Sequence, residues 1–135
     1  MSHLELVKHY YDCFNHQNWP GMIACLDENV QHDSNQGETH FGLDHFRLFL
    51  EKMDESYAEN LTDFTFMVDE TGNRIAAEFV VHGIYKKTDE GLPPAHGQRY
   101  VLPVGAFFEV QNGKIRRITN YYNLNKWLSM VSFEF

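Results

Sequence analysis

The spacing of the apolar residues changes about halfway along the chain, and this change constrains the fold most strongly. Up to about residue 57 they recur every three or four positions, as in a helix with one buried face. From about residue 64 they alternate with polar residues, as in a strand with one buried face. Helices followed by strands predict an α+β domain with the helices packed on one face of the sheet.

Three helices are predicted in the first half. Ser2 followed by Glu5 has the spacing of a capping box and indicates the start of the first helix. A second helix begins near Trp19, because a proline such as Pro20 is tolerated in a first helical turn. A third covers about residues 43–57.

The second half contains four predicted strands, at about 64–68, 75–81, 100–110 and 115–122. The Asn-Gly pair within 111–114 predicts a hairpin between the last two strands. Residues 88–98 contain Gly91, Pro93, Pro94 and Gly97 and are therefore a loop. Strands of this length twist and curl, so the sheet and its helices can enclose a pocket.

Length, charge and cysteine usage narrow the possible classes of protein. The 135 residues fit one domain over 1–135, and no signal peptide or membrane-spanning run is visible. A net charge of −8 argues against nucleic acid or an anionic membrane as partner. Two cysteines make no disulfide framework, which favours a cytoplasmic location. The eight histidines lack metal-ligand spacing, so no metal is expected.

Several short patterns resemble a known family. They are His9-Tyr10-Tyr11-Asp12-x-Phe14-Asn15, Trp19-x-Gly21-Met22-x-x-x-Leu26, Val30-x-x-Asp33, Gly105-Ala106-Phe107-Phe108-x-Val110-x-Asn112-Gly113-Lys114-Ile115 and Asn120-Tyr121-Tyr122. Together they resemble the ketosteroid isomerase-like (SnoaL-like) branch of the NTF2-like superfamily, and within it the uncharacterised ketosteroid isomerase-related proteins. The resemblance implies a cone of three N-terminal helices packed on a strongly curved, mixed but mostly antiparallel sheet. It also implies an internal cavity for a small apolar or aromatic ligand, a homodimer and no cofactor.

The resemblance implies two catalytic residues. Asp33 lies where the isomerases carry their general base, and Tyr10 where they carry a hydroxyl that stabilises the enolate. Gly105 lies where they carry a protonated aspartate as second donor, so this chain departs from their pattern there. From the residues alone, Asp33 also fits a turn and Tyr10 a core position. His32 and Asp33 are adjacent in an extended segment and are expected to face opposite sides.

Further residues are predicted to contact the ligand. His82 is read either as an acid–base partner of Asp33 or as a histidine that faces away from Phe79 and Val81. His82, Asn120 and Tyr122 are the candidate substitutes for the missing donor. The remaining predicted ligand contacts are Trp19, Tyr57, Gly105, Phe107 and Tyr122.

Two functions follow from these expectations. The first is cofactor-independent acid–base chemistry of the isomerase, cyclase or dehydratase type on a small apolar carbonyl compound. The second is a non-catalytic ligand-binding or dimeric scaffold domain. A homodimer is expected through a sheet face that carries Val101, Phe107 and Tyr121 or Tyr122. The apolar segment 127–135 is expected to pack over the cone or onto the partner subunit.

Overall fold

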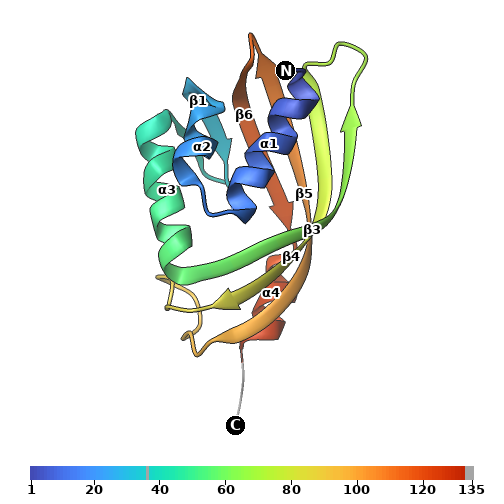
Figure 1. Cartoon of the computed structure of the whole chain (residues 1–135). Helices are drawn as coiled ribbons and strands as arrows, with labels where there is room; N and C mark the ends of the chain where they lie inside the picture. Colours follow the sequence, from blue (N-terminus) through green and yellow to red (C-terminus); the bar gives the residue numbers. More distant parts are fainter. Residues whose placement is uncertain (36, 133–135) are drawn as a thin grey trace.

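The protein is a mixed α+β structure in which helices pack on a curved six-stranded sheet (Figure 1). The computed structural model describes residues 1–35 and 37–132. The elements are α1 (His3–Asn15), α2 (Trp19–Ala24), β1 (Leu26–Asp33), β2 (Thr39–Phe41), α3 (Leu43–Ser56), β3 (Tyr57–Val68), β4 (Arg74–Tyr85), β5 (Gln98–Gln111), β6 (Lys114–Tyr122) and α4 (Leu124–Val131). The predicted fold class is confirmed.

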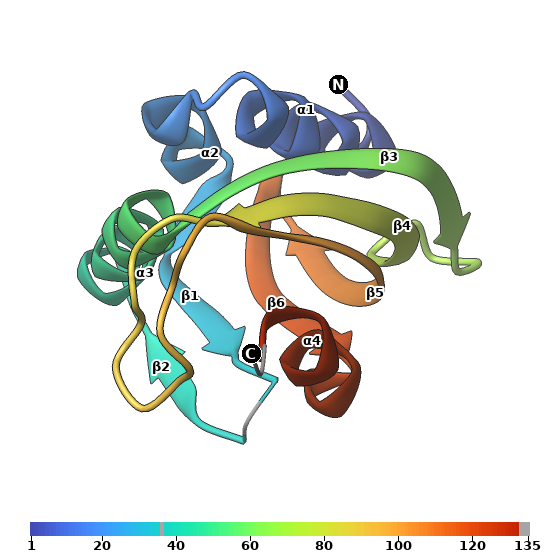
Figure 2. The ribbon, with the colours of Figure 1, turned by 90° about the horizontal axis from the view of Figure 1, so that it is seen from below.

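The strand order is β2-β1-β6-β5-β4-β3. β1 and β6 pair in parallel and the other neighbours are antiparallel, so the sheet is mixed and mostly antiparallel, as expected. The parallel pair joins the N-terminal third of the chain to its last strand. The sheet curves strongly without closing, with α1, α2 and α3 along one side of it (Figure 2).

β3 begins directly after α3, at Tyr57, seven residues before the predicted strand start at Phe64. A bulge between Thr62 and Thr65 resets its pairing with β4, and Asp63 within this bulge has a φ of 57°. A bulge adds an unpaired residue and bends the strand. It also shifts the inward-facing positions of β3, from Leu61 before the bulge to Phe64 and Phe66 beyond it, so one continuous alternation does not run through the strand.

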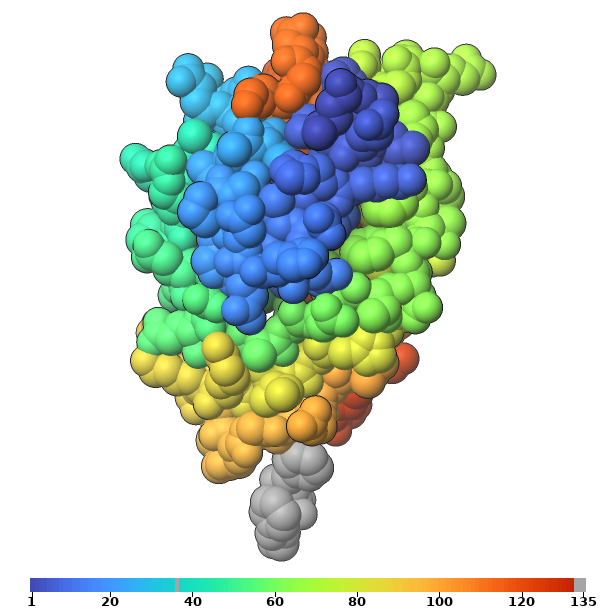
Figure 3. All heavy atoms as spheres, in the orientation of Figure 1, coloured from blue at the N-terminus to red at the C-terminus, as the bar shows by residue number. Residues whose placement is uncertain are grey.

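The N-terminal helices form one layer over the sheet. Ser2 caps α1 by accepting a hydrogen bond from the backbone N–H of Glu5 at 3.0 Å, as the capping-box spacing predicted. α1 buries Val7, Tyr10 and Tyr11 against the sheet. In the space-filling view, α1 and α2 (blue) occupy the upper centre of this face, and α3 (teal) lies at its left margin (Figure 3).

The segment after β6 forms a helix that the sequence patterns did not predict. α4 buries Trp127 and Val131, and the side-chain amide of Gln98 donates to the carbonyl of Val131 at 2.8 Å. The expectation that the apolar C-terminal segment packs on the cone is met as far as residue 132; residues 133–135 lie outside the described residues. Within the described part of the chain, no helix is long and apolar enough to cross a membrane.

Candidate functional site

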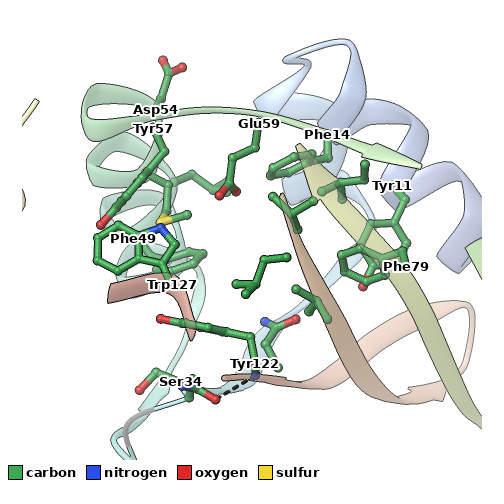
Figure 4. Close-up of a pocket in the computed structure, with 18 of the residues that line it drawn as sticks. Tyr11, Phe14, Ser34, Phe49, Asp54, Tyr57, Glu59, Phe79, Tyr122 and Trp127 are labelled. Atoms are coloured by element: carbon green, nitrogen blue, oxygen red, sulfur yellow. Dashed lines mark hydrogen bonds between the residues drawn. The ribbon is translucent and has the colours of Figure 1, made fainter. Parts of the chain in front are cut away.

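A cavity of about 330 Å³ lies between the helices and the concave face of the sheet. Its wall is largely aromatic. Figure 4 shows Phe49, Tyr57 and Trp127 on one side and Phe14, Tyr11 and Phe79 on the opposite side. The aromatic lining residues are Tyr10, Tyr11, Phe14, Trp19, Phe49, Tyr57, Phe79, Tyr100, Tyr122 and Trp127. Such a wall suits a ligand with a flat apolar body.

The charged groups of the cavity are all acidic. Asp54, Glu59 and Asp89 line it, whereas no lysine or arginine is among the described residues that do so. An anion bound in this apolar space would meet negative charge and no compensating cation, which is unfavourable at short range. The cavity therefore favours ligands without a negative charge.

Glu59 is the acid that reaches furthest into this apolar surrounding. Its side chain extends from β3 between the two aromatic walls (Figure 4). The hydroxyl of Tyr100, on β5, donates to Glu59 Oε2 at 2.5 Å. Burial raises the pKa of Glu59, and the hydrogen bond from Tyr100 opposes part of that rise. A carboxyl with a raised pKa can accept and return protons near neutral pH.

Asp89 holds the loop between β4 and β5 at the edge of the cavity. The hydroxyl of Tyr57 donates to Asp89 Oδ2 at 2.8 Å. Tyr85 accepts from the backbone N–H of Asp89 at 3.0 Å and donates to the carbonyl of Pro93 at 2.6 Å. Two tyrosines that end β4 and begin β3 thus anchor the loop, whose Leu92 also lines the cavity.

His32 lies in the cavity wall and is buried, with 5% of its surface exposed. Its ring lies against Phe46 and Phe49, with centroids 5.1 and 4.4 Å away. Burial, and secondarily the nearby His40, lower the pKa of His32 to about 4. The imidazole is therefore neutral at pH 7 and can act as a hydrogen-bond donor or acceptor without adding charge.

Asp33 does not line the cavity, so its expected position was wrong. As expected, it faces the opposite side of β1 from its neighbour His32, and His32 is the one turned inward. Both carboxylate oxygens of Asp33 are occupied: Oδ1 by Gln31 and Thr39, Oδ2 by Thr119 and Arg117. The position of Asp33 was predicted wrongly because alternation places His32 and Asp33 on opposite faces but does not say which of them faces inward.

His82, Gly105 and Phe107 also lie outside the cavity, contrary to the predicted ligand contacts. His82 is exposed and contacts Thr62 Oγ1 at 3.0 Å. Gly105 faces outward between neighbours that face inward on β5, and no atom lies within 4 Å of the position its Cβ would take. The place matched to the second oxyanion donor therefore does not face the cavity at all.

The other predicted ligand contacts line the cavity: Tyr10, Trp19, Tyr57, Asn120 and Tyr122. Burial raises the pKa of Tyr10 well above its usual range, so its hydroxyl keeps its proton. No protein partner for that hydroxyl is found among the described residues. The roles of these residues in binding remain predictions, and their positions are compatible with such roles.

Glu59 and Tyr100 were not predicted as functional residues. The signal was nevertheless present, because Tyr57, Glu59 and Leu61 occupy alternate positions and share one strand face. An acid between two such residues is a polar group on an apolar face. The predicted helix extended to residue 57 and the predicted strand began at 64, so this segment was not read as a strand.

A metal site is not found in the described part of the chain, because no three metal-ligating side chains gather there. The polar groups that line the cavity include carboxyls, phenols, amides and a neutral imidazole. These groups can move protons and stabilise a developing enolate by hydrogen bonding.

The curved sheet, the helical cover and the internal cavity define an NTF2-like protein of the ketosteroid isomerase-like superfamily. The model of the SnoaL-like domain family matches residues 7–118, and the chain belongs to this family. No curated protein matches the chain. The similarity to solved structures extends over nearly the whole molecule.

Three crystal structures named as candidate polyketide cyclases are similar to this protein. The one from Pseudomonas putida is 52% identical, with a TM-score of 0.96, and the match covers 98% of this chain and 99% of that one. The one from Xanthomonas campestris pv. campestris is 51% identical, with a TM-score of 0.93 and 96% of each chain covered. The one from a Silicibacter species is 42% identical, with a TM-score of 0.95, covering 98% of this chain and 96% of that one.

Proposed function

We propose that this protein carries out cofactor-independent acid–base chemistry on a small, uncharged, apolar carbonyl compound bound in the cavity. The reaction type is that of an isomerase, cyclase or dehydratase. One observation carries the proposal: the Glu59 carboxyl lies in an apolar cavity, without a cation in the described lining, and is hydrogen-bonded by Tyr100. The similarity to proteins named as polyketide cyclases supports a carbonyl substrate.

In this proposal Glu59, rather than Asp33, is the general base. The carboxylate takes a proton from the carbon next to the substrate carbonyl, and the C–H electron pair moves onto the carbonyl oxygen to give an enolate. Returning the proton to another carbon gives isomerisation. Attack of the enolate carbon on a second carbonyl gives cyclisation, in which the new alkoxide takes the proton from Glu59. Tyr10 and Asn120 line the same cavity and are the proposed donors to the enolate oxygen.

The test follows proton removal directly and needs no knowledge of the natural product. Cavity-sized ketones such as 2-tetralone are incubated with the protein in D₂O, and loss of the α-proton signal is followed by NMR. We expect exchange above the buffer rate, and Glu59→Gln lowers it by at least roughly a hundredfold. Asp33→Asn is the matched control and retains exchange, because Asp33 lies outside the cavity. Full exchange in Glu59→Gln would contradict the proposal.

A non-catalytic binding domain is the second candidate. It is favoured by the occupied state of the carboxyls: Tyr100 already donates to Glu59, and Asp33 is fully hydrogen-bonded. This candidate predicts that ketones bind without exchange. It also predicts that Tyr10→Phe and Glu59→Gln each change ligand affinity by less than roughly threefold.

We also propose a homodimer formed through the outer face of the sheet, the face turned away from the cavity. Val101, Phe107 and Tyr121 are exposed there, and the rings of Phe107 and Tyr121 touch at a centroid distance of 5.8 Å. A cytoplasmic location and a single domain over residues 1–135 complete the proposal. The two cysteines, Cys13 and Cys25, are buried and unpaired, as in a reducing compartment.

A further inference from the structure

We infer that Gly83 is a positioning residue for Glu59, because its lack of a side chain lets Tyr100 cross β4 and reach the carboxyl. The inference rests on the proposed function only for its consequence in catalysis. Its structural content concerns three residues on three neighbouring strands.

The three residues form one row across the sheet. Glu59 on β3 is paired with Gly83 on β4, and Gly83 is paired with Tyr100 on β5. Directly opposed residues of paired strands face the same side of a sheet. Because neighbouring strands are about 4.8 Å apart, β3 and β5 are about 10 Å apart here. The 2.5 Å hydrogen bond between Tyr100 and Glu59 therefore requires a side chain that passes over β4.

The Tyr100 ring occupies the space that a side chain at position 83 would need. A Cβ at Gly83 would lie 2.1 Å from Cζ, 2.2 Å from Cε2 and 2.5 Å from the hydroxyl oxygen of Tyr100. The ring is rigid and packs edge-on against Trp127, with centroids 6.0 Å apart. Any residue with a Cβ at position 83 therefore displaces the phenol of Tyr100 and its hydroxyl.

The backbone does not require glycine at this position. Gly83 is absent from the residues with positive φ, and a glycine inside a strand weakens the strand. Its neighbours Val81 and Tyr85 on the same face are buried and large. The space taken by Tyr100 thus accounts for a glycine that neither the backbone nor strand propensity explains.

The contact between Tyr100 and Glu59, which Gly83 makes possible, influences how strongly the Glu59 carboxylate binds a proton. Burial raises the pKa of Glu59, and the Tyr100 hydroxyl holds it down by donating to the carboxylate. Tyr122 on β6 and the Tyr57–Asp89 pair at the loop are the other titratable groups near this end of the cavity. Losing the Tyr100 hydrogen bond raises the pKa of Glu59 further, so a smaller share of the carboxyl is ionised and available as a base.

The test is an NMR titration of Glu59 in protein labelled with ¹³C at the glutamate carboxyl, with the signal assigned by its loss in Glu59→Gln. We expect Gly83→Ala and Tyr100→Phe each to strengthen proton binding by Glu59 about tenfold, since a hydrogen bond to a charged group is lost in both. Gly105→Ala is the matched control, because a Cβ there meets no atom within 4 Å. Wild-type titration of Glu59 in Gly83→Ala would overturn the inference.

A second measurement covers the case in which Gly83→Ala does not fold. Gly83→Ala is combined with Tyr100→Ala, which removes the ring, and its thermal unfolding is compared with that of Tyr100→Ala alone. We expect the two midpoints to lie close together, whereas Gly83→Ala lowers the midpoint strongly when Tyr100 is present. An equal cost with and without the ring would overturn the inference.

Neither measurement uses a substrate. If no ketone exchanges its α-proton, the proposed function fails while the titration still tests Gly83. If exchange depends on Glu59 but Gly83→Ala leaves its titration unchanged, the inference fails and the proposed function stands.

Discussion

Two buried tyrosine hydroxyls differ in their hydrogen bonding: one has partners within the protein and the other has none among the described residues. The hydroxyl of Tyr85 has partners in Pro93 and Asp89. The hydroxyl of Tyr11 is buried among aromatic rings and has no partner among the described residues. A buried polar group without a hydrogen bond costs about 1–3 kcal/mol, so Tyr11 is a local weakness in an otherwise well-packed core.

This difference predicts opposite effects for the same substitution. Tyr11→Phe removes an unsatisfied hydroxyl and keeps the ring, so we expect the free energy of unfolding to stay equal or to rise by up to about 1 kcal/mol. Tyr85→Phe removes two hydrogen bonds and lowers it by about 1–3 kcal/mol. Urea unfolding of both variants measures these changes. Destabilisation by Tyr11→Phe would show that the hydroxyl has a partner in solution.

At the scale of elements, Asp33 connects β1 to β6, the parallel pair of the sheet. Partial burial alone would raise the pKa of Asp33, but hydrogen bonds from Gln31, Thr119, Thr39 and Arg117 lower it well below its usual range. Arg117 also donates to Glu109 on β5 at 2.9 Å and Thr39 lies on β2, so the network spans the four strands β2, β1, β6 and β5. The carboxylate predicted to be catalytic is thus placed where it holds the sheet together.

The lowered pKa makes this contribution dependent on pH. A group with a lower pKa in the folded state stabilises fully above its unfolded pKa of about 3.9, and the stabilisation is lost as pH falls below it. We expect Asp33→Asn to lower the free energy of unfolding by about 1–3 kcal/mol at pH 7 and to differ progressively less from wild type below pH 4. Urea unfolding across this range, with the exposed Asp44→Asn as control, tests this. A gap that persists at low pH would contradict it.

At the scale of the whole molecule, the notable feature is the outer face of the sheet, which is turned away from the cavity. Val101, Phe107 and Tyr121 are 51%, 44% and 56% exposed on this one face. Apolar side chains that gather in this way mark interaction surfaces more often than isolated ones do. We therefore expect sedimentation equilibrium at micromolar concentration to give twice the 15.9 kDa chain mass.

Charged substitutions test whether the dimer forms through this face or through another exposed apolar residue. Phe107→Glu combined with Tyr121→Glu places charge in the proposed interface, and we expect it to give monomers. Leu48→Glu, at an equally exposed leucine on α3, leaves the dimer intact. A wild-type protein that sediments as a monomer would rule out the proposed dimer.

The spacing of apolar residues alone determined the fold class and which residues lie on the same face of an element. The change from helical to alternating spacing predicted helices packed on a sheet, and it correctly separated His32 from Asp33. It succeeded there because which residues share a face follows from local spacing. The capping of α1 by Ser2 was likewise predictable from spacing.

Only the tertiary structure decided which face encloses the cavity. Alternation relates neighbours to one another but leaves the absolute direction to strand pairing, so Asp33, Gly105 and Phe107 were expected at the cavity although they lie outside it. The bulge between Thr62 and Thr65 interrupts the alternation of β3, so its first residues, including Glu59, were not predicted as part of a strand. The contact of Glu59 with Tyr100 joins residues 41 positions apart across a third strand, and such a contact depends on register, which no local pattern encodes.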